Sequence, residues 1–146
     1  MKKNNATISL TSYQNDGENS DTSEIITVGD FSKKNDHFEI SYKETEATGY
    51  EGCITKLSVF DNKKIIMNRT GNFFSNLIIE KSKKHFCQYG TPYGEMIVGI
   101  TTKEITSDLN NDGGRVNFKY VIDINSSYVS DFDVTIDVKK QGENTL

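Results

Sequence analysis

Hydrophobic and polar residues alternate strictly near the end of the chain. Between positions 131 and 139 every second residue is apolar, namely Phe132, Val134, Ile136 and Val138. Successive side chains of a strand point to opposite faces, so this period of two predicts a half-buried β-strand. Residues 116–124 repeat the pattern, and only Val121 departs from it. We therefore predict a mostly antiparallel sheet with one face on the core.

The same alternation divides the rest of the chain into strands separated by turn residues such as Asp61-Asn62 and Asp112-Gly113, which are typical of tight reversals. Residues 45–52 have no clear period and are expected to form a loop or one helical turn. Gly99 is expected to mark a bend or bulge. We count eight to ten strands, starting near residue 6 and continuing at about 24–33, 38–44, 52–60, 65–69, 73–80, 86–89, 95–105, 116–124 and 131–139.

The fold class predicted from these strands is all-β. A long sheet of sequential hairpins curls, and closing it removes the exposed edge strands. We therefore favour a single antiparallel up-and-down β-barrel over a two-sheet sandwich. The 146 residues fit one domain, with an ordered core at about 6–139 and flexible ends.

Composition and charge exclude several classes of partner. The 17 basic and 21 acidic side chains give a net charge of -4, which repels nucleic acid and anionic lipid. The chain has no apolar run near the roughly 20 residues that cross a bilayer and no secretory pattern at its start. We expect a cytoplasmic protein that contacts neither membrane nor nucleic acid, with Cys53 and Cys87 reduced.

Several short segments, taken together, are familiar. They are Tyr42-Lys43-Glu44, the run from Thr48 and Gly49 through Gly52 to Thr55, Met67-Asn68-Arg69-Thr70-Gly71, and Thr91-Pro92-Tyr93-Gly94. In this order and spacing they resemble the YwiB-like family of small bacterial proteins. The resemblance implies a calycin-like β-barrel related in shape to lipocalins and fatty-acid-binding proteins, a bacterial cytosolic setting and a possible ligand inside the barrel. It implies no reaction and no catalytic residues.

Three polar residues are expected to meet inside one rim of the barrel. Glu44 continues the inward face of Tyr42, Arg69 ends the inward face of a later strand, and Thr55 begins the strand between them. A carboxylate, a hydroxyl and a guanidinium within an apolar wall could anchor the polar head of a ligand. A simpler interpretation is an internal ion pair that fixes the strand register.

The aromatic residues allow two interpretations of the barrel interior. Tyr89, Tyr93, Phe118 and Tyr120 could line a cavity with Tyr42, or fill the interior, since about eight strands enclose little more than their own side chains. We expect most of these aromatic side chains to fill the barrel interior. Small inward groups such as Cys53, Thr55 and Gly99 nevertheless predict a pocket of a few hundred Å³ at the rim.

No catalytic pattern is present in the sequence. His37 and His85 have no metal-ligand spacing and are expected at the surface, so we predict neither a metal nor a cofactor. The best hypothesis is a non-enzymatic binding module for a small, partly apolar or amphiphilic ligand, using Glu44, Thr55, Arg69, Tyr42 and Tyr93. The alternative is a protein interaction or structural module with a filled barrel, a monomer or possibly a homodimer. A hydrolase or isomerase with Glu44 as base has the least support.

Overall fold

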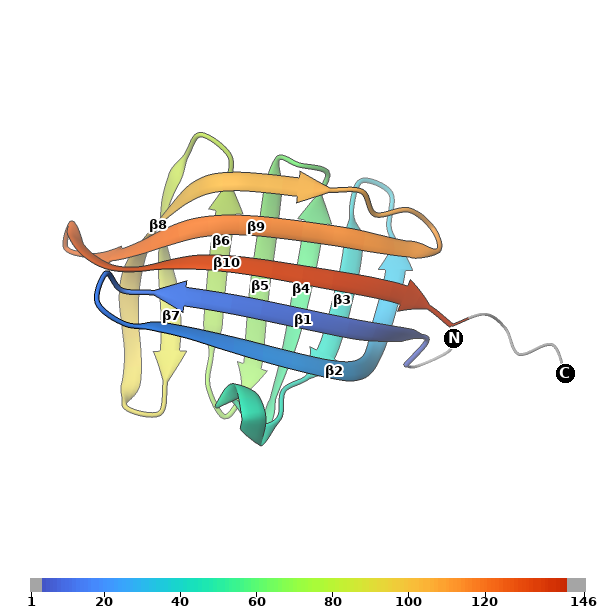
Figure 1. The fold of residues 1–146 in the computed structure, drawn as a ribbon, viewed down its shortest axis with the longest axis horizontal. Helices are drawn as coiled ribbons and strands as arrows, with labels where there is room; N and C mark the ends of the chain where they lie inside the picture. Colours follow the sequence, from blue (N-terminus) through green and yellow to red (C-terminus); the bar gives the residue numbers. More distant parts are fainter. Residues whose placement is uncertain (1–3, 142–146) are drawn as a thin grey trace, which may run out of the picture.

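The fold is a closed barrel of ten antiparallel strands in up-and-down order, as predicted (Figure 1). The computed structural model describes residues 4–141. Each strand pairs with its neighbours in sequence, and β1 pairs with β10 to close the ring. The elements are β1 (Ala6–Asn15), β2 (Ser20–Lys33), β3 (Phe38–Lys43), the 3-10 turn η1 (Glu46–Thr48), β4 (Cys53–Phe60), β5 (Lys64–Gly71), β6 (Ser75–Glu80), β7 (Lys84–Thr91), β8 (Gly94–Ser107), β9 (Gly113–Ile124) and β10 (Ser127–Lys140).

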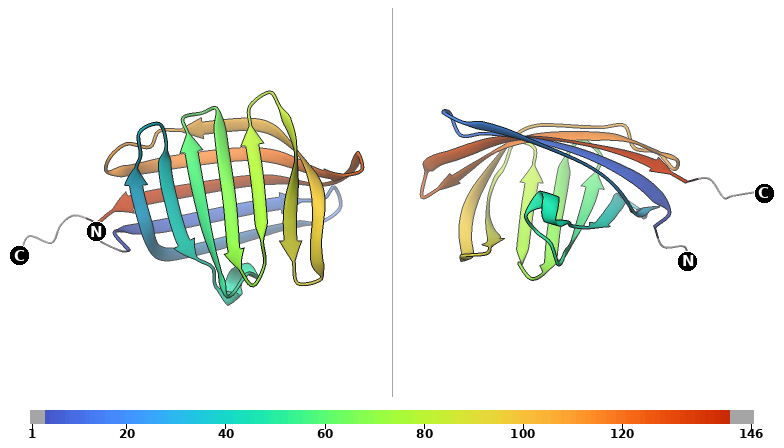
Figure 2. Two further views of the ribbon diagram at one scale, coloured as in Figure 1. Left: turned by 180° about the vertical axis from the view of Figure 1, so that it is seen from behind. Right: turned by 60° about the horizontal axis from the view of Figure 1, so that its bottom comes forward.

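Two long strands carry the chain from one side of the barrel to the other. The left view of Figure 2 shows β3 to β7 in front of β1, β9 and β10, with β2 and β8 bending between the two groups. In β2 the close approach occurs at Gly29, where a Cβ would overlap the carbonyl oxygen of Ser41. Glycine at this position lets two backbones come together at the corner of the barrel.

The β-bulge of β8 does not lie at Gly99, the position suggested for a bend or bulge. Gly99 pairs regularly with Phe86 and Asp123, and the register of the β8–β9 pair shifts between Thr102 and Glu104. Gly99 has another structural role, because Lys84 and Asp123 form an ion pair of 3.0 Å beside it, and a Cβ would overlap the Asp123 carboxylate. The glycine therefore makes room for an ion pair across the outer face of three strands, and the prediction that Gly99 is a small inward group beside the pocket is wrong.

The strand pairing is weakest between β6 and β7, where Asn76 and Gln88 form the single registered pair. Some backbone N–H groups at this pair of strands donate to side-chain atoms instead of to backbone carbonyls. The Ile78 N–H donates to Cys87 Sγ at 3.3 Å, and the Gly90 N–H donates to Ser75 Oγ at 2.9 Å. These contacts satisfy backbone donors that a regular ladder would otherwise pair.

The core lies inside the barrel and is built by the alternating inward residues. Every second residue of β10, from Val134 to Val138, is buried there, as the opening pattern of the sequence predicted. The expected flexible ends fall largely on residues 1–3 and 142–146, outside the described residues. Gln141, which lies beyond the predicted ordered core, still donates its backbone N–H to the Asn5 carbonyl at 2.8 Å. The largest fully buried side chains are Phe118, Ile8, Ile40, Leu57, Ile65, Ile79, Ile100 and Ile136.

Candidate functional site

A row of inward polar side chains crosses four neighbouring strands at the end of the barrel that carries η1. The strand register places Tyr42 opposite Thr55, Thr55 opposite Arg69 and Arg69 opposite Ser75. Glu44 follows β3 on the same face as Tyr42, two residues further along. All five residues are buried. The period of two that buries the apolar core thus also brings these polar groups together.

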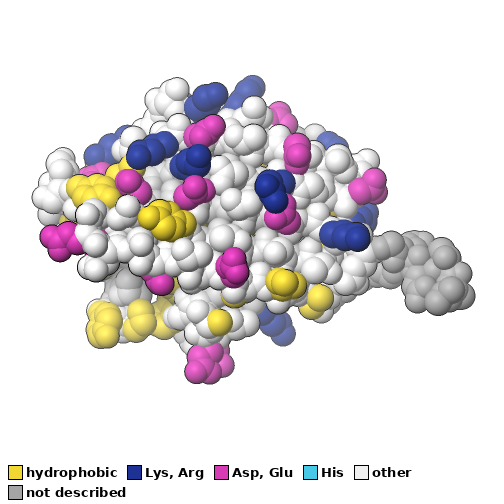
Figure 3. All heavy atoms as spheres, in the orientation of Figure 1, with side chains coloured by type: hydrophobic (Ala, Val, Ile, Leu, Met, Phe, Trp, Pro, Cys, Tyr) yellow, Lys and Arg dark blue, Asp and Glu magenta, His cyan; other side chains and the backbone are white. Residues whose placement is uncertain are grey.

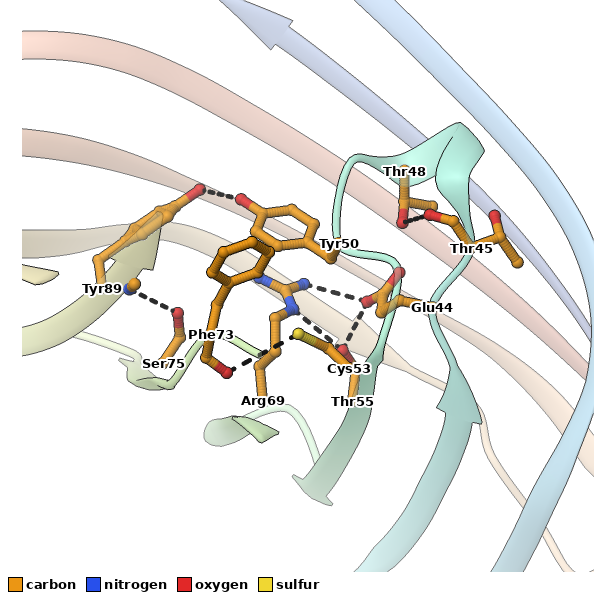
Figure 4. Close-up of polar contacts among 11 residues, drawn as sticks. Glu44, Thr45, Thr48, Tyr50, Cys53, Thr55, Arg69, Phe73, Ser75 and Tyr89 are labelled. Atoms are coloured by element: carbon orange, nitrogen blue, oxygen red, sulfur yellow. Dashed lines mark hydrogen bonds and ion pairs between the residues drawn. The ribbon is translucent and has the colours of Figure 1, made fainter. Parts of the chain in front are cut away.

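Glu44, Thr55 and Arg69 form a closed set of hydrogen bonds (Figure 4). The Thr55 hydroxyl donates to Glu44 Oε2 at 2.5 Å. Arg69 donates from Nε to Thr55 Oγ1 at 3.1 Å and from Nη2 to Glu44 Oε2 at 3.2 Å. The predicted approach of Glu44 and Arg69 within hydrogen-bonding reach is confirmed. A guanidinium has more N–H donors than these two contacts use, so Arg69 retains donors for a further partner.

Tyrosine side chains surround this set. The Tyr50 ring lies over the guanidinium, with the Arg69 carbon 3.8 Å from the ring centre, and the Tyr50 hydroxyl meets the Tyr89 hydroxyl at 2.7 Å. Tyr42 and Tyr120 are buried beneath, and Tyr120 stacks on Phe132 with ring centres 5.0 Å apart. This end of the barrel therefore combines a buried ion pair with four tyrosines, Tyr42, Tyr50, Tyr89 and Tyr120, which we call the phenol wall.

Burial controls the ionisation of these groups. Desolvation raises the pKa of Tyr42, Tyr89 and Tyr120 well above the ordinary value of tyrosine, so these phenols stay neutral and can donate hydrogen bonds. Burial, the largest single influence, would lower the pKa of Arg69, but the negative charge of Glu44 and the neighbouring tyrosines together outweigh it, so the pKa is raised. The site thus presents a permanent cation beside neutral hydroxyl groups.

Tyr93 is a correction to the predicted site. Its side chain is 98% exposed, because it lies in the turn between β7 and β8, beyond the last inward position of either strand. It neither lines nor fills the interior. Tyr89, Phe118 and Tyr120 do belong to the interior, with Tyr89 partly buried at the edge of the core.

Sequence reasoning missed Tyr50 and Ser75. Tyr50 lies in the aperiodic segment between η1 and β4, where no pattern indicates a direction for its side chain. Ser75 could have been found, because the β5–β6 hairpin register puts it opposite Arg69. Identifying Ser75 as the partner of Arg69 requires the correct position of the turn at residues 71–74. The sequence analysis predicts that this strand begins at residue 73, two residues before its observed start.

Two inward hydroxyls, on β8 and β10, have no hydrogen-bond partner among the described residues. They are the buried atoms Thr102 Oγ1 and Ser130 Oγ. Thr102 lies opposite Tyr120 in β9, and Ser130 lies opposite Ile122, two residues further along the same face. Each also borders a shift of strand register. Unpaired buried hydroxyls are uncommon and indicate a place for water or a ligand group.

Two surface hollows lie away from this site. One of about 220 Å³ borders Gln14 and Asn19 at the β1–β2 turn, and one of about 440 Å³ lies near Ser9, Arg115 and Asp137. Neither touches Arg69. The predicted rim pocket stays a prediction, and the Tyr50 ring occupies the place where it would begin.

The histidines lie outside the site, whereas Cys53 borders it, with its Sγ donating to the Phe73 carbonyl at 3.8 Å. Both histidines, expected at the surface, are only partly exposed, and each contacts at least one carboxylate. His37 is partly buried between Asp36 and Glu39, at 2.7 and 3.1 Å, and His85 contacts Glu80 at 2.8 Å. Within residues 4–141, no cluster of three or more His, Cys, Asp or Glu side chains could hold a metal ion. Cys53 and Cys87 are free and buried. Over the same range no helix is long and apolar enough to span a membrane.

Comparison with known proteins gives a consistent family. The uncharacterized beta-barrel protein YwiB of Bacillus subtilis (strain 168) is 26% identical over 114 residues, which cover 78% of each protein. The crystal structure of the ywiB protein from Bacillus subtilis matches with a TM-score of 0.81 at 22% identity, over 94% of this chain and 92% of that chain. It shares the barrel fold, and neither description names a reaction or a ligand. Residues 8–136 match the family described as a domain of unknown function, DUF1934, so the chain belongs to this family, as its resemblance to YwiB-like proteins predicted.

Proposed function

We propose that the protein binds a small, partly apolar ligand inside the η1 end of the barrel and does not transform it. The polar head of the ligand contacts Arg69, whose position is fixed by Glu44 and Thr55. The apolar body lies along Tyr42 and Tyr120 of the phenol wall. Binding sites of this kind are mostly apolar and use a few polar groups for orientation.

The cost of burying the ion pair supports this proposal. Removing two charges from water carries a desolvation penalty of several kcal/mol per ion, and well-packed apolar residues can replace a buried pair without loss of stability. A barrel that only needed a filled core could therefore use aliphatic residues at positions 44 and 69. The charges are more easily understood if a ligand uses them.

The main support for the proposal is that the barrel interior contains hydrogen-bonding groups without a partner in the described part of the protein. The Thr102 and Ser130 hydroxyls lack partners among the described residues, and Arg69 donates only part of its N–H groups in the contacts above. Each unpaired buried group costs about 1–3 kcal/mol. A ligand with a polar head would recover part of that energy on binding.

Thermal denaturation with a set of fatty acids and other amphiphilic metabolites tests the proposal, since a ligand that binds the folded state raises the Tm. The chain has two arginines, and the second provides a matched control. Arg115 is exposed and pairs with Asp137 at 2.7 Å. We expect a ligand that stabilises the wild type and Arg115→Met similarly, and Glu44→Gln/Arg69→Met much less. Equal shifts in all three proteins would exclude Arg69 as the anchor.

A second candidate function is protein interaction, with the barrel filled. Its support is an apolar patch on the outside of the β7–β8 hairpin, where Phe86 is 73% and Ile97 is 62% exposed, next to Tyr93 at the tip. Figure 3 shows hydrophobic side chains gathered at this end of the molecule. Exposed apolar patches often mark contact surfaces. Homodimerisation is one form of this function.

Sedimentation velocity separates the second candidate from the first. A dimer formed through the hairpin would dissociate in Phe86→Ser/Ile97→Ser. It would persist in Ile26→Ser, which removes another exposed isoleucine, on β2. A wild type that sediments as a monomer at micromolar concentration would count against homodimerisation through this patch.

A further inference from the structure

The Tyr50 side chain makes three specific contacts at the opening of the site. Its ring face lies on the Arg69 guanidinium at 3.8 Å. Its edge meets the Phe73 ring with centres 6.1 Å apart and an interplanar angle of 79°. Its hydroxyl reaches the Tyr89 hydroxyl of β7 at 2.7 Å. Figure 4 shows the ring between these groups. Together they form a seat for a flat, electron-rich ring with a hydroxyl at its far end.

The backbone that carries Tyr50 belongs to no strand. It lies between Gly49 and Gly52, both with positive φ, at 84° and 89°, and the preceding turn η1 has no buried residue. Two hydrogen bonds hold it, from Cys53 N–H to the Tyr50 carbonyl at 3.0 Å and from Asn72 Nδ2 to the Glu51 carbonyl at 3.2 Å. The phenol can therefore leave its seat without breaking any strand pair.

We infer that Tyr50 occupies the place of the ligand, and that the ligand class is a hydroxylated aromatic ring, a phenol, which displaces it. This inference rests on the proposed function and names its ligand class. An incoming phenol would stack its ring on Arg69, form an edge-type contact with the Phe73 ring and place its hydroxyl, its polar group, on Tyr89, as Tyr50 now does. A saturated ring of equal size lacks the π face that a guanidinium attracts.

The test removes the resident ring from the full-length protein and supplies a free one. The probe is p-cresol, which is the tyrosine side chain itself, and the control is 4-methylcyclohexanol. In Tyr50→Gly the seat is empty, whereas in the wild type the probe must displace Tyr50. We expect p-cresol to bind Tyr50→Gly about tenfold or more tightly than the wild type. We expect 4-methylcyclohexanol to bind both weakly, and Tyr50→Gly/Arg69→Met to lose the preference for p-cresol.

A second variant reports displacement directly and does not depend on an empty seat. The chain has no tryptophan, so Tyr50→Trp supplies a single tryptophan stacked on Arg69, which can be excited apart from the tyrosines. We expect p-cresol to shift its emission to longer wavelength, because a displaced indole enters water. An unchanged emission spectrum at saturating p-cresol would show that the segment does not open and would overturn the inference.

The outcomes also separate this inference from the proposed function. If amphiphiles stabilise the wild type through Arg69 while p-cresol and 4-methylcyclohexanol bind Tyr50→Gly equally, the aromatic class is wrong and the proposed function stands. If p-cresol fills the empty seat of Tyr50→Gly but no compound binds the wild type, Tyr50 is a permanent part of the core. That result overturns both.

Discussion

Glu44 and Arg69 are 25 residues apart in the sequence, and their side chains meet at 3.2 Å inside the barrel, where they are 2% and 9% exposed. The two residues stand on the same inward face, separated by Thr55 of the intervening strand. Thr55 bonds to both of them. The pair is therefore a desolvated one, for which losing one partner has a different effect from losing both.

Arg69→Ala should lower the free energy of unfolding by about 3–5 kcal/mol, because it leaves the Glu44 carboxylate buried without its cation. The exposed pair of Arg115 and Asp137 provides the contrast, and Arg115→Ala should cost less than about 1 kcal/mol. Urea denaturation measures both. The double variant Glu44→Leu/Arg69→Met should recover much of the loss. If the double variant is as unstable as Arg69→Ala, the stranded charge is not the cause.

The barrel and the triad could be predicted from the sequence for one physical reason. Alternation with a period of two fixes both the strand and the face, so the inward positions of Tyr42, Glu44 and Arg69 follow from the residues that precede them. The order of hairpins then fixes which strands are neighbours. A slip of the register by one residue would turn the buried face of a strand toward solvent, which is costly. The positions of the short turns therefore indicate which residues of neighbouring strands lie opposite each other.

The segments that the sequence could not place lack this period. Tyr50 follows a loop whose path depends on Arg69 and Tyr89, two contacts distant in sequence. Tyr93 was misplaced because a tyrosine in a turn carries no signal of direction. The bulge at Thr102 and Glu104 contains no glycine, whereas Gly99 makes room for an ion pair. The position of a glycine in the sequence therefore could not locate the β-bulge of β8.

Gly29→Ala should destabilise the protein at or above the upper end of the roughly 1–3 kcal/mol typical of overpacking, because the new methyl group would overlap the Ser41 carbonyl of the paired strand. Gly99→Ala is the matched control. There the obstacles are the ends of the Asp123 and Lys84 side chains, which can move aside. Chemical denaturation of both variants checks the order, and an equal or larger loss for Gly99→Ala would contradict the close backbone approach in β2.

Both thiols should be free and protected in the native protein. Cys53 and Cys87 are unpaired and buried, and burial raises the pKa of Cys87 above its usual value, which reduces the reactive thiolate. Ellman's reagent should react slowly with the folded protein and rapidly with both cysteines after unfolding without reductant. Protein purified under alkylating conditions that yields no free thiol on unfolding would contradict the prediction.

His37 should make stability depend on pH near neutrality. Its hydrogen bond with Asp36, at 2.7 Å, and its contact with Glu39, at 3.1 Å, raise the pKa of the imidazole. A raised pKa in the folded state means that protonation favours folding. The stabilisation is fully present below the unfolded pKa of about 6.5 and is lost as the pH rises through the higher folded pKa.

His37→Gln tests this sign directly. The difference in free energy of unfolding between wild type and His37→Gln should be larger at about pH 5.5 than at about pH 8.5, by on the order of 1 kcal/mol or less for so shallow a pair. At the lower pH Asp36 remains charged, because its hydrogen bond with His37 lowers the pKa of its carboxyl group. Asp36→Asn should weaken the same dependence, because the Asp36 bond is the larger cause of the shift. A difference that grows toward alkaline pH would show that His37 is bound as the neutral imidazole, and NMR titration of its ring protons would then give a pKa below that of the unfolded chain.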